Sequence, residues 1–513
     1  MTGKKKLKNN SSISKKQLTL FGFFTLTASM LMSADEYPAF AESGLMAVVF
    51  LVVAALIWFL PVALCSAEMA TIDGWEEGGV FTWVKNALGE RAGFVAVAMQ
   101  WMQNTINFVT MLYFIIGAIS FAVNVPILNE NPVIKYVLFL IIFWTLTLSQ
   151  LGGISKTDII VKICFIFGII IPSIIFLILA FTYILQGNPP QIDLSSSAIS
   201  FNKFSISSFV PFILAFAGIE ASASYANQME NPKRSYPLAI LLLVLFAVVL
   251  DALGGLAVGI VVPVSELSMN SGVLQAVQIA IKEIAPALSW CTRFIAILLA
   301  MGMIGEVSSW VVGPVRTLFA AAQDQLLPAY FAKGNKHNVP VRLVILQGVV
   351  VSVIGAILTL AFGGNNSAFK ISMSLTVMMY MVTYMFIFIA YLRILFKGSK
   401  LKKTFQIPGG KVVKTMIGFV GLISTILVFV ATFIPSSEVQ MVMSQELYII
   451  LMLVMFLLVL GGVLALYQKE EDRIKGVKLL THHHAKPSEV NPYIFPKGRS
   501  SKIFSVDKEN QSN

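Results

Sequence analysis

Long apolar stretches separated by short polar ones dominate the sequence between residues 18 and 467. A helix needs about twenty mostly apolar residues to cross the hydrocarbon core of a bilayer, and twelve stretches meet that length. The pattern therefore predicts an all-α integral membrane protein with twelve transmembrane helices. The expected spans are 18 to 44, 45 to 69, 93 to 123, 133 to 152, 159 to 186, 206 to 228, 237 to 262, 290 to 322, 341 to 362, 368 to 396, 412 to 433 and 446 to 467.

Polar and small residues interrupt two of these stretches at membrane depth. Asp35, Glu36 and Pro38 break the first, and Gly218 and Glu220 break the sixth. A carboxylate inside the bilayer is costly unless it lines a cavity or meets a ligand. Non-helical backbone at that depth must likewise be covered by protein or face a polar cavity. Both breaks are therefore predicted to line a binding site, the alternative being a structural carboxylate bonded to a neighbouring helix.

The spacing of the two broken spans predicts an internal symmetry. They are five spans apart, and an odd number turns the second unit upside down relative to the first. Spans 1 to 5 (18–186) and spans 6 to 10 (206–396) are expected to form an inverted repeat, with two extra helices at 412–467. Half-helix ends expose unpaired N–H and C=O groups. They suit a substrate with both a carboxylate and an ammonium group, such as an amino acid.

Composition and charge placement agree with membrane insertion. Hydrophobic residues make up 57% of the chain and charged residues 12%, whereas about 25% charged residues is usual in soluble proteins. The net charge of +11 does not indicate nucleic-acid binding, because no basic face is interleaved with aromatic residues. Instead, 32 of the 37 basic residues fall on the side that the positive-inside rule assigns to the cytoplasm. Both tails, 1–17 and 468–513, are therefore expected there.

Three further side chains at membrane depth are candidates for the same site. Glu306 lies in the eighth span, and Tyr380 and Tyr384 lie one helical turn apart in the tenth, where two phenols can line one wall of a cleft. For the tyrosines, simple core packing is the alternative. Because burial disfavours the charged form of a carboxyl group, Glu220 and Glu306 are expected to take up protons in acid and admit a ligand that their charges would repel.

The C-terminal tail contains three adjacent histidines, His482, His483 and His484. A free histidine has a pKa of about 6.5, so the cluster gains positive charge in mild acid. Repulsion from a basic cytoplasmic vestibule then predicts a pH gate, and a solvated tail without a role is the alternative. No catalytic, phosphate-loop or metal-ligand spacing occurs, so neither an enzyme nor a cofactor is predicted.

Several stretches resemble a known family, from about Leu18 into the C-terminal tail. They read L-F-G-F-F from Leu20, E-Y-P-A-F-A from Glu36, L-C-S-A-E-M-A-T-I-D-G-W-E-E-G-G-V-F from Leu64, G-I-E-A-S-A from Gly218, S-S-W-V-V-G-P from Ser308 and F-Q-I-P-G-G-K from Phe405. These stretches resemble the amino acid, polyamine and organocation superfamily. Within it, they are most similar to the bacterial glutamate/γ-aminobutyrate antiporters of acid resistance.

The resemblance implies a transporter in the bacterial cell membrane that exchanges extracellular glutamate for cytoplasmic γ-aminobutyrate. Export of that decarboxylation product removes a proton consumed inside the cell, which implies functional coupling to a cytoplasmic glutamate decarboxylase. By the same resemblance, Glu220, Glu306, Tyr380 and Tyr384 match positions along the substrate path. The tail stretch V-N-P-Y-I-F-P-K-G-R resembles a plug that blocks the cytoplasmic mouth at neutral pH and leaves it in acid.

Asp35 departs from the resemblance, because the family members carry a tyrosine before Glu-Tyr-Pro. An added acid at this break repels a glutamate carboxylate unless it is protonated, or it suits a more cationic substrate. A second reading is therefore a transporter of the superfamily with another specificity, either a proton-coupled permease or an exchanger of another amino acid and its amine. A receptor that binds amino acids without flux is a third reading. The short polar tail disfavours it.

Overall fold

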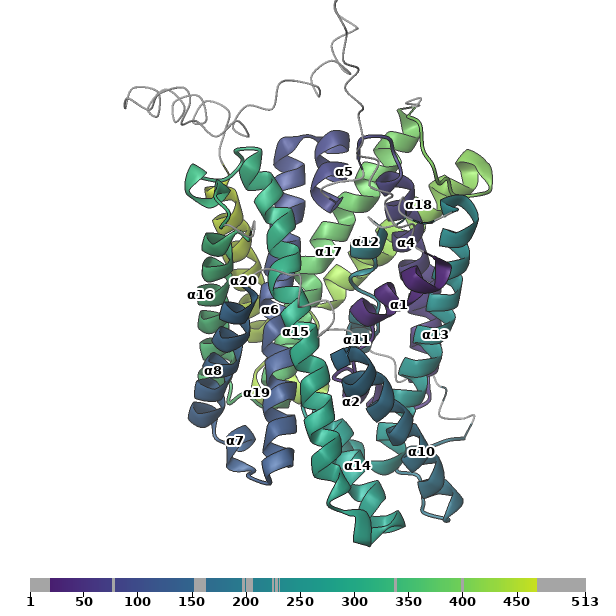
Figure 1. Ribbon diagram of the computed structural model, residues 1–513, viewed down its shortest axis with the longest axis vertical. Coiled ribbons are helices and arrows are strands. Elements are labelled where there is room, and N and C mark those ends of the chain that lie inside the picture. The colour runs from purple at the N-terminus through teal and green to yellow at the C-terminus, as the bar shows by residue number, and fades with distance from the viewer. Residues whose placement is uncertain are drawn as a thin grey trace, which may run out of the picture.

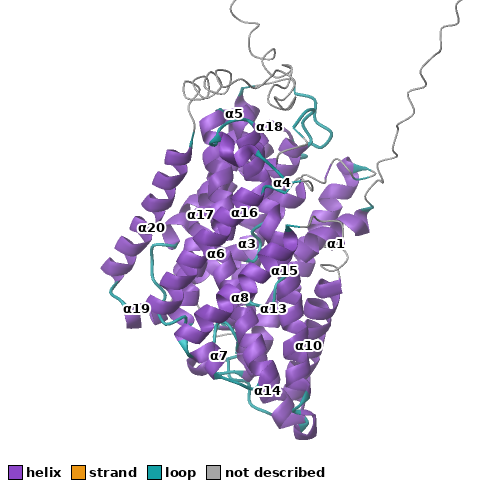
Figure 2. Ribbon diagram, turned by 60° about the vertical axis from the view of Figure 1, so that its left-hand side comes forward, coloured by secondary structure: helices purple, strands orange, loops and turns teal. Residues whose placement is uncertain are grey.

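The computed structural model describes residues 19–75, 79–151, 163–195, 199, 206–223, 226, 229, 231–335, 339–397 and 401–467. Within these ranges the chain folds into helices joined by loops and contains no β-strand (Figure 2). The predicted all-helical class is therefore confirmed. Both predicted tails, with His482, His483 and His484, lie outside the described residues.

The helices follow one another with few long loops. The first set is α1 (Leu20–Leu31), α2 (Tyr37–Ala41), α3 (Met46–Ala54), α4 (Leu60–Ala70), α5 (Gly79–Leu88), α6 (Glu90–Val123), α7 (Ile127–Glu130), α8 (Pro132–Gln150) and α10 (Ile171–Leu185). The second set is α11 (Val210–Leu214), α12 (Ile219–Ala223), α13 (Pro232–Val261), α14 (Gly272–Ile284), α15 (Cys291–Gln323), α16 (Val341–Ala356) and α17 (Asn366–Phe396). The last set is α18 (Gly410–Ala431), α19 (Ser437–Val442) and α20 (Gln445–Leu466).

Short helical turns of other pitch extend these helices. The π-helical turns are Ala55–Phe59, which joins α3 to α4, Ile166–Ile170, which leads into α10, and Ile357–Ala361, which extends α16. The 3₁₀ turns are Ile206–Phe209, Val264–Glu266, Pro286–Leu288 and Ala329–Ala332. The π-helical turns keep α3 with α4, and α16 with its extension, as continuous spans, because each turn follows its helix without a gap.

Eleven helical segments of the described chain are long and apolar enough to cross a membrane. Their bounds lie close to those that the sequence predicts: for example, α6 covers the span expected at 93–123, and α15 the span expected at 290–322. The first predicted span is not among the eleven, because the chain divides it into α1 and α2. With that broken span, the expected twelve are accounted for.

The broken spans lie against each other in opposite directions. Helix α1 packs on α12, and α2 packs on α11, so the first half of one broken span meets the second half of the other. This crossed pairing is what an inverted repeat requires. Figure 1 shows α1 and α2 beside α13, which contacts both. Helix α6 packs extensively against α15 and α17, and these three long helices form the other wall around the breaks.

One buried acid has a purely structural environment. The Glu68 side chain, 1% exposed at the end of α4, accepts hydrogen bonds from the ammonium groups of Lys403 and Lys414, each at 2.9 Å. The Ile407 backbone N–H donates to it at 3.0 Å, and the Tyr391 hydroxyl at 3.2 Å. These contacts fasten α17, α18 and the loop between them to α4. Because two lysines compensate its charge, Glu68 shows what a buried acid with a structural role looks like, and the acids at the breaks can be compared with it.

Candidate functional site

The Glu220 carboxylate joins three elements at the break in the sixth span. It is 1% exposed and belongs to α12. Its oxygens accept hydrogen bonds from Gln100 Nε2 of α6 at 2.8 Å, from the Tyr380 hydroxyl at 2.7 Å and from the Tyr384 hydroxyl at 2.5 Å. The two tyrosines lie on α17 one turn apart, with ring centroids 4.7 Å from each other. The carboxylate therefore ties the broken span to two continuous helices.

Tyr384 also holds the broken backbone itself. Its hydroxyl oxygen accepts a hydrogen bond from the Gly218 N–H at 3.0 Å, and its ring makes an edge contact with Trp58 at 4.7 Å. Gly218 has φ of +106°, a conformation that L side chains rarely adopt. A Cβ there would lie 3.3 Å from the Trp310 ring. Glycine is therefore needed both for the turn and for the close approach of α15.

A small cavity lies between the two breaks and the wall of α6, α15 and α17. Its volume is about 40 Å³, room for water but not for an amino acid. Asp35, Glu36 and Glu306 supply its acidic lining, and Tyr380 forms part of the boundary toward Glu220. Binding of a larger solute therefore requires these elements to move apart.

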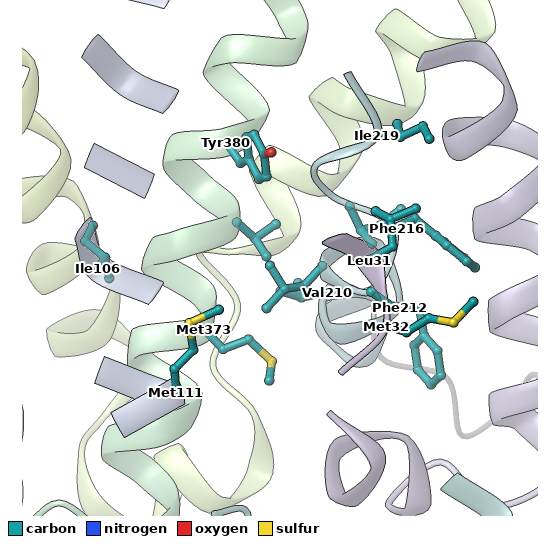
Figure 3. Packing of buried hydrophobic residues seen from close by; sticks show 14 of the residues in the cluster. Leu31, Met32, Ile106, Met111, Val210, Phe212, Phe216, Ile219, Met373 and Tyr380 are labelled. Atoms are coloured by element: carbon teal, nitrogen blue, oxygen red, sulfur yellow. The ribbon is translucent and has the colours of Figure 1, made fainter. Parts of the chain in front are cut away.

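Apolar side chains surround this polar centre. Figure 3 shows Tyr380 extending from its helix toward the segment that carries Phe216 and Ile219. Leu31 and Met32 of the first broken span lie next to Phe216 in the same view. Because apolar side chains enclose the breaks, charged groups there interact more strongly than they do in water.

The acids at the first break lack the balanced environment of Glu68. Ser33 donates a short hydrogen bond to Asp35 and also interacts with Glu306. One oxygen of Glu306, Oε2, is buried without a hydrogen-bond partner, although the side chain is 9% exposed overall. Asp251 of α13 is 4% exposed and acts electrostatically on Glu36. The region therefore holds more acidic groups than its described neighbours can pair with.

Comparison with known proteins agrees with this architecture. A family model described as amino acid permease matches residues 18–460. The chain belongs to this family. Its members and the relatives below are transporters. The broken helices and the buried polar centre of this permease agree with that function.

Individual relatives cover between 69% and 95% of this permease. It is 46% identical over 491 residues to a glutamate/γ-aminobutyrate antiporter of Lactococcus lactis subsp. lactis, a match that spans 95% of this chain and 97% of the relative. It is 31% identical to an uncharacterized transporter of Legionella pneumophila, over 83% of this chain and 91% of the relative. An aspartate/glutamate permease of Lactococcus lactis subsp. cremoris is 22% identical, over 69% of this chain and 74% of the relative.

The structure brings the site residues that the sequence predicts into two neighbouring groups. Gly218, Glu220, Tyr380 and Tyr384 form one hydrogen-bonded group. The second group lines the cavity and consists of Asp35, Glu36 and Glu306. The three histidines lie outside the described residues. A role of any of these side chains in binding substrate stays a prediction.

Sequence reasoning missed four contributors to the permease site. Gln100 bonds Glu220, Trp58 and Trp310 pack at the break, and Asp251 faces Glu36. Two signals were available, because Gln100 interrupts an apolar span and Asp251 is the lone acid between residues 237 and 262. The tryptophans carried no such signal, since large aromatic residues are common in any buried span.

Proposed function

We propose that this permease exchanges extracellular glutamate for cytoplasmic γ-aminobutyrate by alternating access. The observation that carries the proposal is the cavity between two broken helices, lined by Asp35, Glu36 and Glu306 and bounded by Tyr380. Intramembrane ionisable groups at such a midplane site mark a path for polar substrates. The relative that is 46% identical over nearly the full length bears the name of this exchange.

The Glu220 group supplies a gate for that exchange. Gln100, Tyr380 and Tyr384 each bond the carboxylate, so the broken sixth span cannot leave the wall while all three bonds persist. Since the cavity of about 40 Å³ is smaller than an amino acid, substrate entry must break some of these contacts. Substrate groups that replace the lost hydrogen bonds then favour the open form, which is how a ligand shifts such an equilibrium.

The proposal extends to location and regulation. The distribution of basic residues supports placement in the bacterial cell membrane with both termini in the cytoplasm. Residues 468–513 act as a plug at neutral pH, and protonation of His482, His483 and His484 releases it in acid. Transport proceeds without a catalysed chemical step, and a cytoplasmic glutamate decarboxylase supplies the exported amine.

A second candidate is a permease of the same family with another specificity. Asp35 favours it, because the acid adds negative charge next to Glu306 and so suits a more cationic substrate. A 22% identical relative bears the name aspartate/glutamate permease, which is in line with this candidate. A proton-coupled permease fills empty vesicles when a pH gradient is imposed, whereas an exchanger needs substrate on the far side.

Radiolabelled glutamate uptake into proteoliposomes tests the two candidates. The vesicles are loaded with γ-aminobutyrate, with glutamate or with buffer, and assayed at about pH 5.5 and about pH 7.5, on either side of the usual histidine pKa. Uptake that requires internal substrate and appears only in acid supports the acid-activated exchanger. Uptake into buffer-loaded vesicles under a pH gradient supports the proton-coupled permease. Failure with every load, in folded protein, rules out glutamate as the substrate.

A further inference from the structure

A second and larger cavity lies between the first turn of α17 and the short helices α7 and α19. Its volume is about 480 Å³. Figure 1 shows α7 and α19 in the half of the bundle opposite to α5. Helix α5 belongs to a loop that the charge distribution places in the cytoplasm, so this outer cavity faces the extracellular side in the proposed orientation.

Lys135 of α8 is a buried cation in the wall of the outer cavity. It is 1% exposed, and its Nζ donates a hydrogen bond to the Gly364 carbonyl at 2.5 Å and lies 4.3 Å from the centre of the Tyr113 ring. No carboxylate in the described ranges lies within ion-pair distance of this Nζ, whereas carboxylates pair with the other largely buried lysines, Lys370, Lys403 and Lys414. A carbonyl and an aromatic face stabilise an ammonium group but do not neutralise it.

The N-terminus of α17 adds partial positive charge to the same wall. Asn365 caps this 31-residue helix by accepting a hydrogen bond from the Ala368 N–H at 3.2 Å. The first N–H groups of a helix have no acceptor within it, and Asn366 and Ser367, which carry two of them, both line the outer cavity. The positive end of the helix and the Lys135 ammonium group therefore favour the same ligand group, a carboxylate.

Amide side chains hold this wall in place. Asn366 Oδ1 accepts a hydrogen bond from the Met269 N–H, and its Nδ2 donates to the Leu267 carbonyl, both at 2.8 Å. Asn270 Nδ2 donates to Asn129 Oδ1 at 2.7 Å. These bonds join α7, the start of α17 and the loop before α14. The wall is therefore ordered before a ligand arrives, which lowers the entropic cost of binding.

Two acidic side chains, Glu130 and Glu438, also line the outer cavity. Glu438 is paired with Lys370 at 3.0 Å, and neither acid lies within ion-pair distance of Lys135. The lining thus presents positive and negative charges that are not joined to each other. A ligand with both a carboxylate and an ammonium group complements such a lining, whereas a simple anion is repelled by the acids.

The outer cavity adjoins the central cavity, the one between the two breaks, along two helices. On α17, Ser367 lines the outer cavity and Phe369 the central one. On α6, the Tyr113 ring lies against Lys135, and Thr110, one turn away, lines the central cavity. A solute in the outer cavity is therefore about one helical turn from the region that opens when the broken spans move apart.

We propose that the outer cavity is a second amino acid site, which binds glutamate from the extracellular side before it enters the central cavity. Lys135 and the N-terminus of α17 bind a carboxylate of glutamate, and the ammonium group faces Glu130. The inference rests on the proposed function for the choice of glutamate, and it adds a site that exchange at the breaks does not require. Binding here raises the local concentration of glutamate beside the closed central site.

Protection of an introduced cysteine tests this outer site. Met441 is 81% exposed and lines the outer cavity, so it is replaced by cysteine in the full-length chain. The rate of labelling by a polar maleimide is then measured over a series of glutamate concentrations. The chain without the new cysteine gives the background from Cys65, Cys164 and Cys291. Glutamate is expected to slow the labelling until the site is saturated.

Loss of the Lys135 charge should abolish or weaken this protection. Because a charge-assisted hydrogen bond is removed, Lys135→Met is expected to raise the half-protecting glutamate concentration by about tenfold or more. Lys282→Met is the matched control, because Lys282 is an exposed lysine in the last turn of α14. A second arm keeps Lys135 and replaces glutamate by its dimethyl ester, which has no carboxylate and should not protect.

The outcomes separate the outer site from the exchange. If Lys135→Met lowers the unfolding temperature but leaves protection unchanged, the lysine only fastens the Gly364 loop and the inference is wrong. Should Lys135→Met fail to fold, the ester decides: equal protection by the ester and by glutamate overturns carboxylate recognition. Exchange-competent protein whose introduced cysteine glutamate does not protect also contradicts the outer site. Protection without exchange-dependent uptake would instead contradict the proposed function and leave the outer site standing.

Discussion

The Tyr384 hydroxyl donates to Glu220 at 2.5 Å although 164 positions separate the two residues in the chain. The same hydroxyl accepts a hydrogen bond from the Gly218 N–H. One phenol therefore satisfies both a buried carboxylate and an unpaired backbone donor at the break. This double role explains why a break in the sixth span can exist inside an apolar region, where an unpaired backbone group is strongly disfavoured.

Replacing Tyr384 with phenylalanine removes both bonds and keeps the ring against Trp58. A buried group left without its partner costs about 1 to 3 kcal/mol, and the break then loses the ordered geometry that receives substrate. Exchange is expected to slow by about tenfold or more, although the closed form is also held less tightly. Initial rates of glutamate uptake in proteoliposomes measure the effect. The control is Tyr330→Phe, because Tyr330 is 60% exposed in the 3₁₀ turn Ala329–Ala332. Wild-type rates in Tyr384→Phe would show that the gate does not depend on this hydroxyl.

A side chain at Gly218 is expected to destabilise the fold. Alanine there must adopt φ of +106° and place its Cβ 3.3 Å from Trp310, which costs about 1 to 3 kcal/mol. Thermal unfolding in detergent measures the loss. Gly461→Ala is the matched control, because a Cβ at this α20 position meets no atom within 4 Å. Its unfolding temperature should stay the same or rise slightly, since alanine favours helix over glycine. Equal unfolding temperatures for the two variants would contradict a strained turn at Gly218.

Loss of the Glu68 charge is expected to weaken the link between α4 and the α17–α18 loop. Glu68→Gln leaves the ammonium groups of Lys403 and Lys414 largely buried without a counter-charge. Breaking such a pair costs about 3 to 5 kcal/mol, so a clear drop in unfolding temperature should follow. Adding Lys403→Met and Lys414→Met to Glu68→Gln should recover part of the stability. No recovery in the triple variant would show that unpaired charge is not the cause.

The proposed tail gate predicts a change in pH dependence on truncation. A chain that ends before Lys475 lacks the histidine cluster and the plug stretch, so it should transport at neutral pH, where the full-length permease is expected to be silent. Histidines gain charge as pH falls through about 6.5, so their replacement by asparagine should keep the plug closed in acid. Uptake across a pH series measures both shifts, with His337→Asn as the control histidine. If uptake by the truncated chain depends on pH as uptake by the full-length chain does, the tail does not act as the pH gate.

Much of the fold follows from local patterns. Apolar length predicts the spans because each helix satisfies its own backbone in the bilayer, and the eleven spans found in the described chain, the broken sixth among them, match the expected ones closely. The positions of the two breaks can also be predicted from the sequence. Asp35, Glu36, Gly218 and Glu220 are polar or small residues where a spanning helix should be apolar. Asp251 was readable by the same rule. The roles of Glu68 and Glu220 were not, because both are buried acids in apolar runs and their sequence neighbours do not distinguish them.

The sequence by itself determined the class of protein, the number of its spans, the position of both breaks and four of the acids near them, Asp35, Glu36, Glu220 and Glu306. Only the tertiary structure decided which acid pairs with basic side chains and which keeps a carboxylate oxygen free for a ligand. Lys403 and Lys414 reach Glu68 from more than 300 positions away, and Tyr380 and Tyr384 reach Glu220 from more than 150. Glu306 keeps an unpartnered oxygen beside Asp35. The physical reason is that a buried carboxylate is governed by its nearest charges and donors, and in a helical bundle these come from other helices.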